Sequence, residues 1–259
     1  MTRPELHATS PRGADGRPLL VLGPSLGTST ILWEEAAALL EKDFRVVAWD
    51  LPGHGLSPAA TAPFTVGELA DGVAAVLDEL GADRVYYAGD SLGGATGLEL
   101  ARRHPSRVIA LADICSSARF GTAEGWRERA AQSRTQGTAS LVVSSAQRWF
   151  APGSIERHPE ISGRLLHALR DADDESYALC CEALAAFDAR PWLGELAVPV
   201  QVLWGEHDVV VSRDAALEIA DGVQHGAFTA IEDAGHLAPA EQPEAVAAAL
   251  VRLAAEVAA

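Results

Sequence analysis

The sequence predicts an α/β fold: a mostly parallel central sheet flanked by helices, with a helical cap inserted between core strands. Three observations predict it. Short β-branched and aromatic runs alternate with helical segments along most of the chain, which is typical of a parallel sheet covered on both faces. This alternation stops between Ser116 and Leu196, where the pattern is helical only. The stretch Gly89-Asp90-Ser91-Leu92-Gly93 joins a strand-like run to a helical one, as a sharp strand-to-helix turn requires.

Six runs are predicted to be strands because they are short, apolar and rich in β-branched or aromatic residues. The run just before Gly89 is the one that leads into the sharp turn. In chain order the predicted strands are Pro18–Leu22, Arg45–Trp49, Val85–Ala88, Val108–Leu111, Val200–Trp204 and Phe228–Ile231.

Five helices are predicted between or after these strands. Thr65 and Glu68 form a capping box at the start of the second helix. The third helix stops before His104-Pro105, because proline disfavours helical geometry in the residue that precedes it. In chain order the predicted helices are Ile31–Glu41, Thr65–Leu80, Leu92–Arg103, Arg213–Ala220 and Pro243–Ala258.

Residues 116–196 are interpreted as a cap over an active site, with residues 1–115 and 197–259 forming the core. This span contains three of the six tryptophans, Trp126, Trp149 and Trp192, together with several arginines. Extra helices that serve only stability are the alternative. The clustering of tryptophan and arginine favours the cap.

The composition is that of one large α/β domain. The chain has 259 residues, of which 48% are hydrophobic, and this is enough for a sizeable core. A formal charge of −16 argues against nucleic acid and anionic membranes as partners. No apolar run approaches the roughly 20 residues of a membrane span, and no apolar signal-peptide core is found at the N-terminus. The three cysteines suggest neither a metal site nor a disulfide framework, so we expect a cytoplasmic protein without metal or cofactor. Whether it forms a homo-oligomer stays open.

Ser91 is the candidate nucleophile. The small residues two positions before and after it let strand and helix pack closely around a strained turn. Such a turn exposes the hydroxyl and aims the amide of Leu92 at an incoming carbonyl oxygen. A chance match in a glycine-rich loop is the alternative, and the strand–turn–helix context argues against it.

A serine hydroxyl is a poor nucleophile unless a base removes its proton during attack. His236 follows the last predicted strand, and Asp208 follows the strand before it. The order Ser91, Asp208, His236 fits a sheet whose active-site residues collect at the carboxyl ends of the strands. Asp113 and Glu206 are rival candidates for the acid.

The loop after the first strand, Gly23–Thr28, is the candidate for the rest of an oxyanion hole. Its Leu26 amide can pair with that of Leu92, and losing one such donor costs roughly 3–4 kcal/mol of barrier. In the loop after the second strand, Asp50 is expected to stabilise its own loop through hydrogen bonds to the backbone. His54 is interpreted as a turn residue that braces the loop below the site.

With these residues placed, the chain resembles the α/β-hydrolase superfamily and, more narrowly, the 3-oxoadipate enol-lactonases. The likeness covers nearly everything from Pro18 onward. Two departures stand out: Asp90-Ser91-Leu92 stands where Leu-Ser-Met is more familiar, and the short segment before Pro18 implies a trimmed first hairpin. The narrower likeness rests on Ser25-Leu26-Gly27-Thr28, Arg119–Trp126, Arg148-Trp149-Phe150, Tyr177, Cys180–Leu184 and Glu241–Glu244.

The resemblance implies a serine hydrolase that opens an enol-lactone bearing an acetate side chain, through an acyl-enzyme, to give 3-oxoadipate in aromatic-compound degradation. The substrate carboxylate needs a cation, for which Arg129 and Arg134 are the candidates. Solvation at the surface is the alternative for each arginine. Ser25, Trp126 and Trp149 would line the substrate pocket.

Three other functions stay open. A carboxylesterase and a hydrolase of a C–C bond next to a ketone would share the same catalytic residues. A small-ligand receptor would keep the site without useful turnover. A dehalogenase is disfavoured because it would want aspartate at position 91. Oxidoreductase chemistry finds no support, because no dinucleotide-binding glycine fingerprint follows the first strand.

Overall fold

A sheet of six parallel strands forms the centre of the structure, a computed structural model that describes residues 3–258. The strand order is β2-β1-β3-β4-β5-β6, and every neighbouring pair is parallel. The predicted α/β class is confirmed, and each predicted strand is present with ends that differ by a few residues. The strands are β1 (Leu19–Gly23), β2 (Arg45–Ala48), β3 (Val85–Asp90), β4 (Val108–Ile114), β5 (Val200–Gly205) and β6 (Gly226–Ile231).

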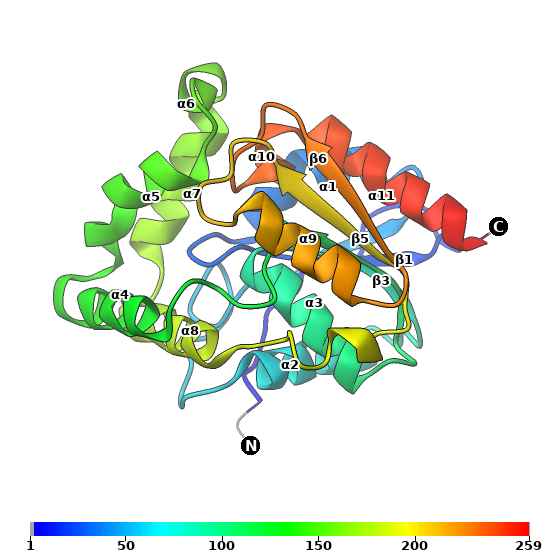
Figure 1. Ribbon diagram of the computed structural model, residues 1–259, viewed down its shortest axis with the longest axis horizontal. Coiled ribbons are helices and arrows are strands. Elements are labelled where there is room, and N and C mark those ends of the chain that lie inside the picture. Colours follow the sequence, from blue (N-terminus) through cyan, green and yellow to red (C-terminus); the bar gives the residue numbers. More distant parts are fainter. Residues whose placement is uncertain (1–2, 259) are drawn as a thin grey trace.

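Helices cover both faces of the sheet. In Figure 1, α1 (Glu34–Leu40) and α11 (Pro243–Ala258) lie on one face, and α2 (Val66–Glu79), α3 (Leu92–Arg103) and α9 (Arg213–Gly222) lie on the other. A short helix, α10 (Ala238–Glu241), precedes α11. The strands β1, β3 and β4 are buried along almost their whole length, as expected for a parallel sheet covered on both sides.

The single helix predicted over 31–41 is corrected by the structure. The segment begins with a 3-10 turn, η1 (Thr30–Trp33), before α1 starts. The Ser29 side chain accepts a hydrogen bond from the amide of Ile31 and so starts the turn at Thr30, one residue before the predicted start. A polar residue at this position favours a cap, which explains the earlier start.

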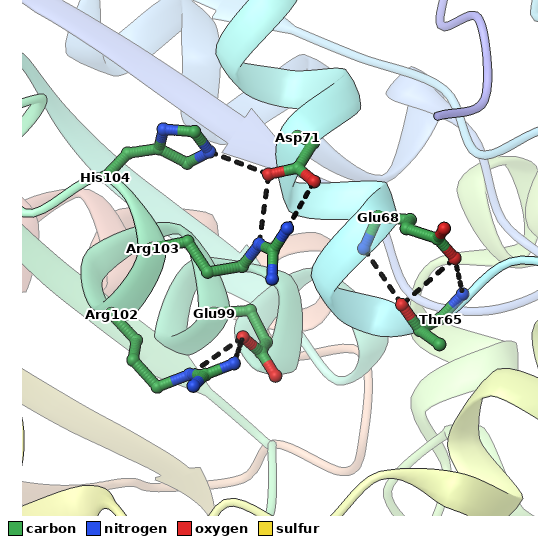
Figure 2. A network of polar contacts seen from close by, with 7 residues as sticks. All are labelled: Thr65, Glu68, Asp71, Glu99, Arg102, Arg103 and His104. Atoms are coloured by element: carbon green, nitrogen blue, oxygen red, sulfur yellow. Dashed lines mark hydrogen bonds and ion pairs between the residues drawn. The ribbon is translucent and has the colours of Figure 1, made fainter. Parts of the chain in front are cut away.

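A polar network fastens α3 to α2 (Figure 2). Asp71 of α2 accepts hydrogen bonds from the Arg103 guanidinium, with its Nε at 3.0 Å, and lies 2.8 Å from the His104 ring at the end of α3. The predicted capping box is confirmed: the Thr65 hydroxyl accepts from the Glu68 amide, and the Glu68 carboxylate accepts from the Thr65 amide. The contacts of Asp71 thus hold the C-terminal end of α3 against α2.

Between β4 and β5 the chain forms only helices and loops. This part, residues 116–196, is called the inserted segment below, and all of it is described. In Figure 1 its helices α4 to α8 gather beside the carboxyl ends of β5 and β6. It contains α4 (Ala123–Gln136), η2 (Thr138–Leu141), α5 (Val142–Trp149), α6 (Ser154–Arg157), α7 (Pro159–Asp171), α8 (Asp174–Ala186) and η3 (Leu193–Glu195).

The segment that precedes β1 pairs only briefly with the edge strand β2 and the residue that follows it. Within the described residues no strand precedes β1. Ala8 and Arg12 form single antiparallel bridges with Trp49 and Val46, respectively. The described residues before β1 thus pair with the sheet through these two isolated bridges. Along residues 3–258, no helix has the length and apolarity that crossing a bilayer requires.

Candidate active site

Ser91 lies in the sharp turn between β3 and α3. Its φ of 55° is in the left-handed region, where a residue other than glycine costs about 1–3 kcal/mol. Two glycines make the turn possible. A Cβ on Gly93 would lie 2.6 Å from the Gly23 carbonyl, and one on Gly89 would collide with the Gly93 carbonyl. The strained strand-to-helix turn predicted from the sequence is present.

The end of β4 supports this turn. The amide of Ser91 donates a hydrogen bond to the Ile114 carbonyl at 2.8 Å, and the Ser116 hydroxyl donates to the Ser91 carbonyl at 2.9 Å. The Tyr87 hydroxyl donates to the Gly93 carbonyl at 3.0 Å. These bonds hold the strained backbone of the serine from both sides.

His236 and Asp208 form a buried pair. The Nδ1 atom of His236 lies 2.9 Å from Oδ2 of Asp208, and both side chains are almost fully buried. The other carboxylate oxygen accepts from the amides of Val210 and Val211, at 2.7 and 3.0 Å. A ring that donates from Nδ1 leaves Nε2 as an acceptor. Ser91 and His236 line the same pocket.

The rival acids lie elsewhere. Asp113 is fully buried within β4, against Gly94, and burial raises the pKa of this carboxyl to about 7. Glu206 is exposed. Only Asp208 among these carboxylates is hydrogen-bonded to His236 in the part of the chain that the structure describes. Within residues 3–258, no three histidine, cysteine, aspartate or glutamate side chains are grouped so as to hold a metal ion.

Two backbone amides are available beside the serine. Leu92 is the first residue of α3, and the first amides of a helix have no acceptor within the helix. Across residues 3–258, no group accepts a hydrogen bond from the amide of Leu92 or of Leu26. The amide of Gly93 donates to the Pro24 carbonyl at 3.0 Å, which holds the loop of Leu26 against the start of α3. The arrangement can therefore stabilise an oxyanion formed at Ser91.

A cleft lies between the sheet edge and the inserted segment. Its inner part has a volume of about 30 Å³, and an outer part of about 220 Å³ shares Trp126, Arg129, Arg148 and Val210 with it. The inner part brings together most of the predicted pocket residues. It is lined by Ser25, Leu26, Ser91 and His236, and by Trp126, Arg129, Ser145, Arg148, Trp149, Tyr177 and Val210.

Two arginines give the cleft its charge. Arg129 donates from Nε to the Tyr177 hydroxyl at 2.7 Å and from its terminal nitrogen to the Ser145 hydroxyl at 3.1 Å. In the described part of the chain, neither Arg129 nor Arg148 is paired with a carboxylate. Desolvation, and then the nearby charge of Arg129, lower the pKa of Arg148. The cleft thus carries two uncompensated cations in a chain whose formal charge is −16.

Arg134, the other predicted candidate for binding the substrate carboxylate, does not line the cleft, and this prediction is corrected. Its guanidinium bonds to Glu175 at 2.7 Å and to Glu182 at 2.5 Å, both on α8. These ion pairs lie outside the lining of the cleft. Arg148, to which the sequence analysis assigned no role, lines the cleft in its place.

Sequence reasoning also missed a bridge between the inserted segment and the loop that carries His236. The buried Glu241 carboxylate accepts from the amides of Ala151 and Gly235, each at 2.7 Å. The Trp149 carbonyl accepts from the His236 amide at 2.8 Å. No local pattern indicates this bridge, because Ala151 and Glu241 are 90 positions apart in the sequence.

Comparisons with known proteins agree with this geometry. A family model described as alpha/beta hydrolase fold matches residues 18–243. The chain is 36% identical to 3-oxoadipate enol-lactonase 2 of Acinetobacter baylyi, over 90% of this chain and 87% of that protein. The enol-lactonase from Burkholderia xenovorans superposes with a TM-score of 0.92 at 33% identity, covering 96% of both chains. A thermophilic esterase from Thermogutta terrifontis, solved with malate bound, superposes with a TM-score of 0.90 at 26% identity, covering 97% of this chain and 93% of that one.

Proposed function

The chain belongs to the alpha/beta hydrolase fold family and is a hydrolase acting on ester or lactone bonds, and we propose that its substrate is a small lactone bearing a carboxylate. The most specific candidate is the 3-oxoadipate enol-lactone, which the names of two similar proteins point to. One observation carries the proposal. The cleft that joins Ser91 to the His236–Asp208 pair also presents two arginines, Arg129 and Arg148, without a carboxylate partner among the described residues.

The proposed reaction begins at the serine. Ser91 Oγ attacks the lactone carbonyl while Nε2 of His236 takes its proton, and Asp208 stabilises the imidazolium that forms. The amides of Leu26 and Leu92 donate hydrogen bonds to the oxyanion, each worth roughly 3–4 kcal/mol of barrier. The strained turn at Ser91 supports this role because it sets the hydroxyl beside both donors.

The bond between the acyl carbon and the ring oxygen then breaks, and the ring oxygen becomes an enolate, a better leaving group than an alkoxide. The opened molecule stays esterified to Ser91 through its acyl carbon. The enolate takes up the proton that the His236 imidazolium holds and becomes a ketone. His236 activates a water that releases the product, a dicarboxylate. We place this step in the degradation of aromatic compounds in the cytoplasm, on the resemblance of the motifs.

We propose that the inserted segment, residues 116–196, acts as a cap domain on a core made of residues 1–115 and 197–259. The inner cleft of about 30 Å³ has room for little more than a water molecule. A lactone bound at Ser91 would therefore extend between Arg129 and Arg148 into the outer part. These guanidiniums can bind its carboxylate with charge-assisted hydrogen bonds, while Trp126 and Trp149 form the walls.

A carboxylesterase is the second candidate function. The likeness to the Thermogutta terrifontis esterase favours it, because an acyclic ester would use the same serine, histidine and amides. The two candidates differ in what they require of the cap. A lactonase of the proposed kind needs the arginines of the cleft, whereas a neutral ester does not.

Hydrolysis of the 3-oxoadipate enol-lactone, followed by its ultraviolet absorbance, tests the proposal. We expect kcat/KM above roughly 10⁴ M⁻¹s⁻¹, the lower end for ordinary enzymes, and no turnover in Ser91→Ala. A neutral aryl ester measured beside it separates the candidates. Serine-dependent cleavage of the aryl ester with no turnover of the lactone would establish the esterase and reject the lactonase.

A further inference from the structure

The loop that contains Leu26 is a tight turn whose peptide planes need an outside support. The amide of Thr28 donates to the Ser25 carbonyl at 3.0 Å, which closes a four-residue turn over Ser25–Thr28. Gly27 has a φ of 83°, the third-position geometry of a type II turn. In such a turn the Leu26–Gly27 peptide can rotate between two orientations, and this rotation shifts Leu26.

His54 supplies that support from another loop. Its Nε2 accepts a hydrogen bond from the Gly27 amide at 3.3 Å, and its Nδ1 lies 2.8 Å from the Pro52 carbonyl. Because a carbonyl can only accept, Nδ1 carries the proton and Nε2 is the acceptor. The bond to Pro52 fits the interpretation of His54 as a turn residue that braces its own loop, and the bond to Gly27 joins that loop to a second one. Gly27 directly follows Leu26, so the bond fixes one of the two peptide planes that flank the oxyanion residue.

The environment of the ring keeps it neutral. His54 is 1% exposed. Burial is the largest influence and lowers the pKa of the ring, although the Pro52 carbonyl and the carboxylates of Asp50 and Asp173 act in the opposite direction. A protonated ring would present N–H groups from both nitrogens and could not accept from Gly27.

The same ring contacts the inserted segment. It stacks on Tyr177 of α8 with centroids 6.0 Å apart, and the Tyr177 hydroxyl accepts from Arg129. Beside it, the amide of Asp173 donates to the Gly53 carbonyl at 2.8 Å. His54 therefore lies where the oxyanion loop, its own turn and the start of α8 meet.

We propose that His54 is a positioning residue of this enzyme: it accepts the Gly27 amide and so fixes the turn that presents the Leu26 amide to the oxyanion. It touches no reacting atom. This inference rests on the proposed function only in that the Leu26 amide stabilises an oxyanion. It deepens that proposal by assigning a new residue to the same site.

Two substitutions at position 54 separate the acceptor from the rest of the ring. His54→Gln can place a carbonyl oxygen near the position of Nε2 and keep an acceptor for Gly27. His54→Asn is shorter, and its amide can replace only the donor near Nδ1. If His54 served only the stability of the fold, both substitutions would impair activity. If it positions the turn through its acceptor, glutamine alone preserves activity.

The test measures kcat and KM for an aryl ester, with His225→Gln as an exposed control. We expect His54→Asn to lower kcat about 10-fold with KM almost unchanged, because an oxyanion donor acts in the transition state. We expect His54→Gln to stay within about 3-fold of wild type. Equal losses in both variants, or a change in KM alone, would overturn the proposal.

Amide hydrogen exchange at Gly27, measured by NMR, needs no turnover and keeps the test independent of the proposed function. The Gly27 amide should be protected in wild type and in His54→Gln, and it should exchange faster in His54→Asn. Equal exchange in wild type and His54→Asn would refute the positioning role even if the lactone is hydrolysed. Conversely, the expected exchange pattern without any ester hydrolysis would support the hydrogen bond from Gly27 to His54 and would reject the proposed hydrolysis.

Discussion

Arg129 and Arg134 are alike in sequence context but differ in what they contact. They lie five positions apart on α4, and each residue of a helix advances by 100°, so they point about 140° apart around its axis. Arg129 lines the cleft and bonds only to neutral hydroxyls, whereas Arg134 is neutralised by two glutamates of α8. The charge of a cation that is already paired with carboxylates is compensated, so it attracts a substrate anion only weakly.

We predict that Arg148→Gln raises KM for a carboxylate-bearing lactone by about 10- to 100-fold. A hydrogen bond to a charged group is worth about 1.5–3 kcal/mol, which corresponds to this range. Arg129→Gln should act in the same direction. Steady-state kinetics on the lactone measure the effect.

Arg134→Gln is the matched control for these variants, since Arg134 is on the same helix as Arg129 and outside the cleft. It should leave KM for the lactone unchanged. A neutral aryl ester should be insensitive to all three substitutions. If Arg134→Gln alone raised KM, the assignment of the substrate carboxylate to the cleft arginines would be rejected.

At the scale of elements, the inserted segment and the loop of His236 are bonded into one unit. The Trp149 carbonyl accepts from the His236 amide, and Glu241 of α10 accepts from the amides on each side of this contact, at Ala151 and Gly235. Buried hydrogen bonds therefore tie the end of α5 to the loop that carries His236.

We predict that Glu241→Gln lowers the free energy of unfolding by about 1–3 kcal/mol, the cost of leaving a buried amide unsatisfied. A glutamine has one acceptor oxygen, so its NH₂ group would face one of the two amides. Because the loop of His236 is then less well held, kcat should fall as well. Urea unfolding and steady-state kinetics measure the two effects.

Glu256→Gln offers a control for this change, because Glu256 is exposed near the end of α11. Its effect on stability should stay within about 0.5 kcal/mol. If Glu241→Gln were as well tolerated as Glu256→Gln, the bridge would contribute nothing to holding the loop of His236.

For the whole molecule, buried carboxyls make stability depend on pH. Burial raises the pKa of Asp113 to about 7, and burial together with the charge of Asp208 raises the pKa of Asp90 well above its usual range. The folded state therefore holds protons that the unfolded chain releases near 3.8. Stability from these groups is fully present below the unfolded pKa and is lost as pH rises through the folded pKa.

We predict that Asp113→Asn becomes progressively more stable, relative to wild type, as pH rises toward 7. The difference in unfolding free energy between the two proteins should change by about 1.4 kcal/mol per pH unit between about pH 5 and about pH 7. It should level off above that range. Urea unfolding of both proteins across this range measures the slope. A constant difference would mean that Asp113 is ionised in the folded protein throughout.

The sequence by itself determined the features that depend on neighbouring residues. The strained turn at Ser91, the capping box at Thr65 and the parallel strands follow from local sterics, hydrogen bonding and burial, so a short pattern is enough to predict them. The placing of Asp208 and His236 follows from strand order, because parallel strands end at one edge of the sheet.

Only the tertiary structure decided which side chains reach the cleft. Few residues of α4 are buried, so its sequence does not show which face it presents, and Arg129 and Arg134 are equivalent until α8 packs against it. The bond between Gly27 and His54 spans 27 positions, and the bond between Ala151 and Glu241 spans 90. Contacts at such separations depend on how whole elements pack, and packing direction is not encoded in any short stretch of the chain.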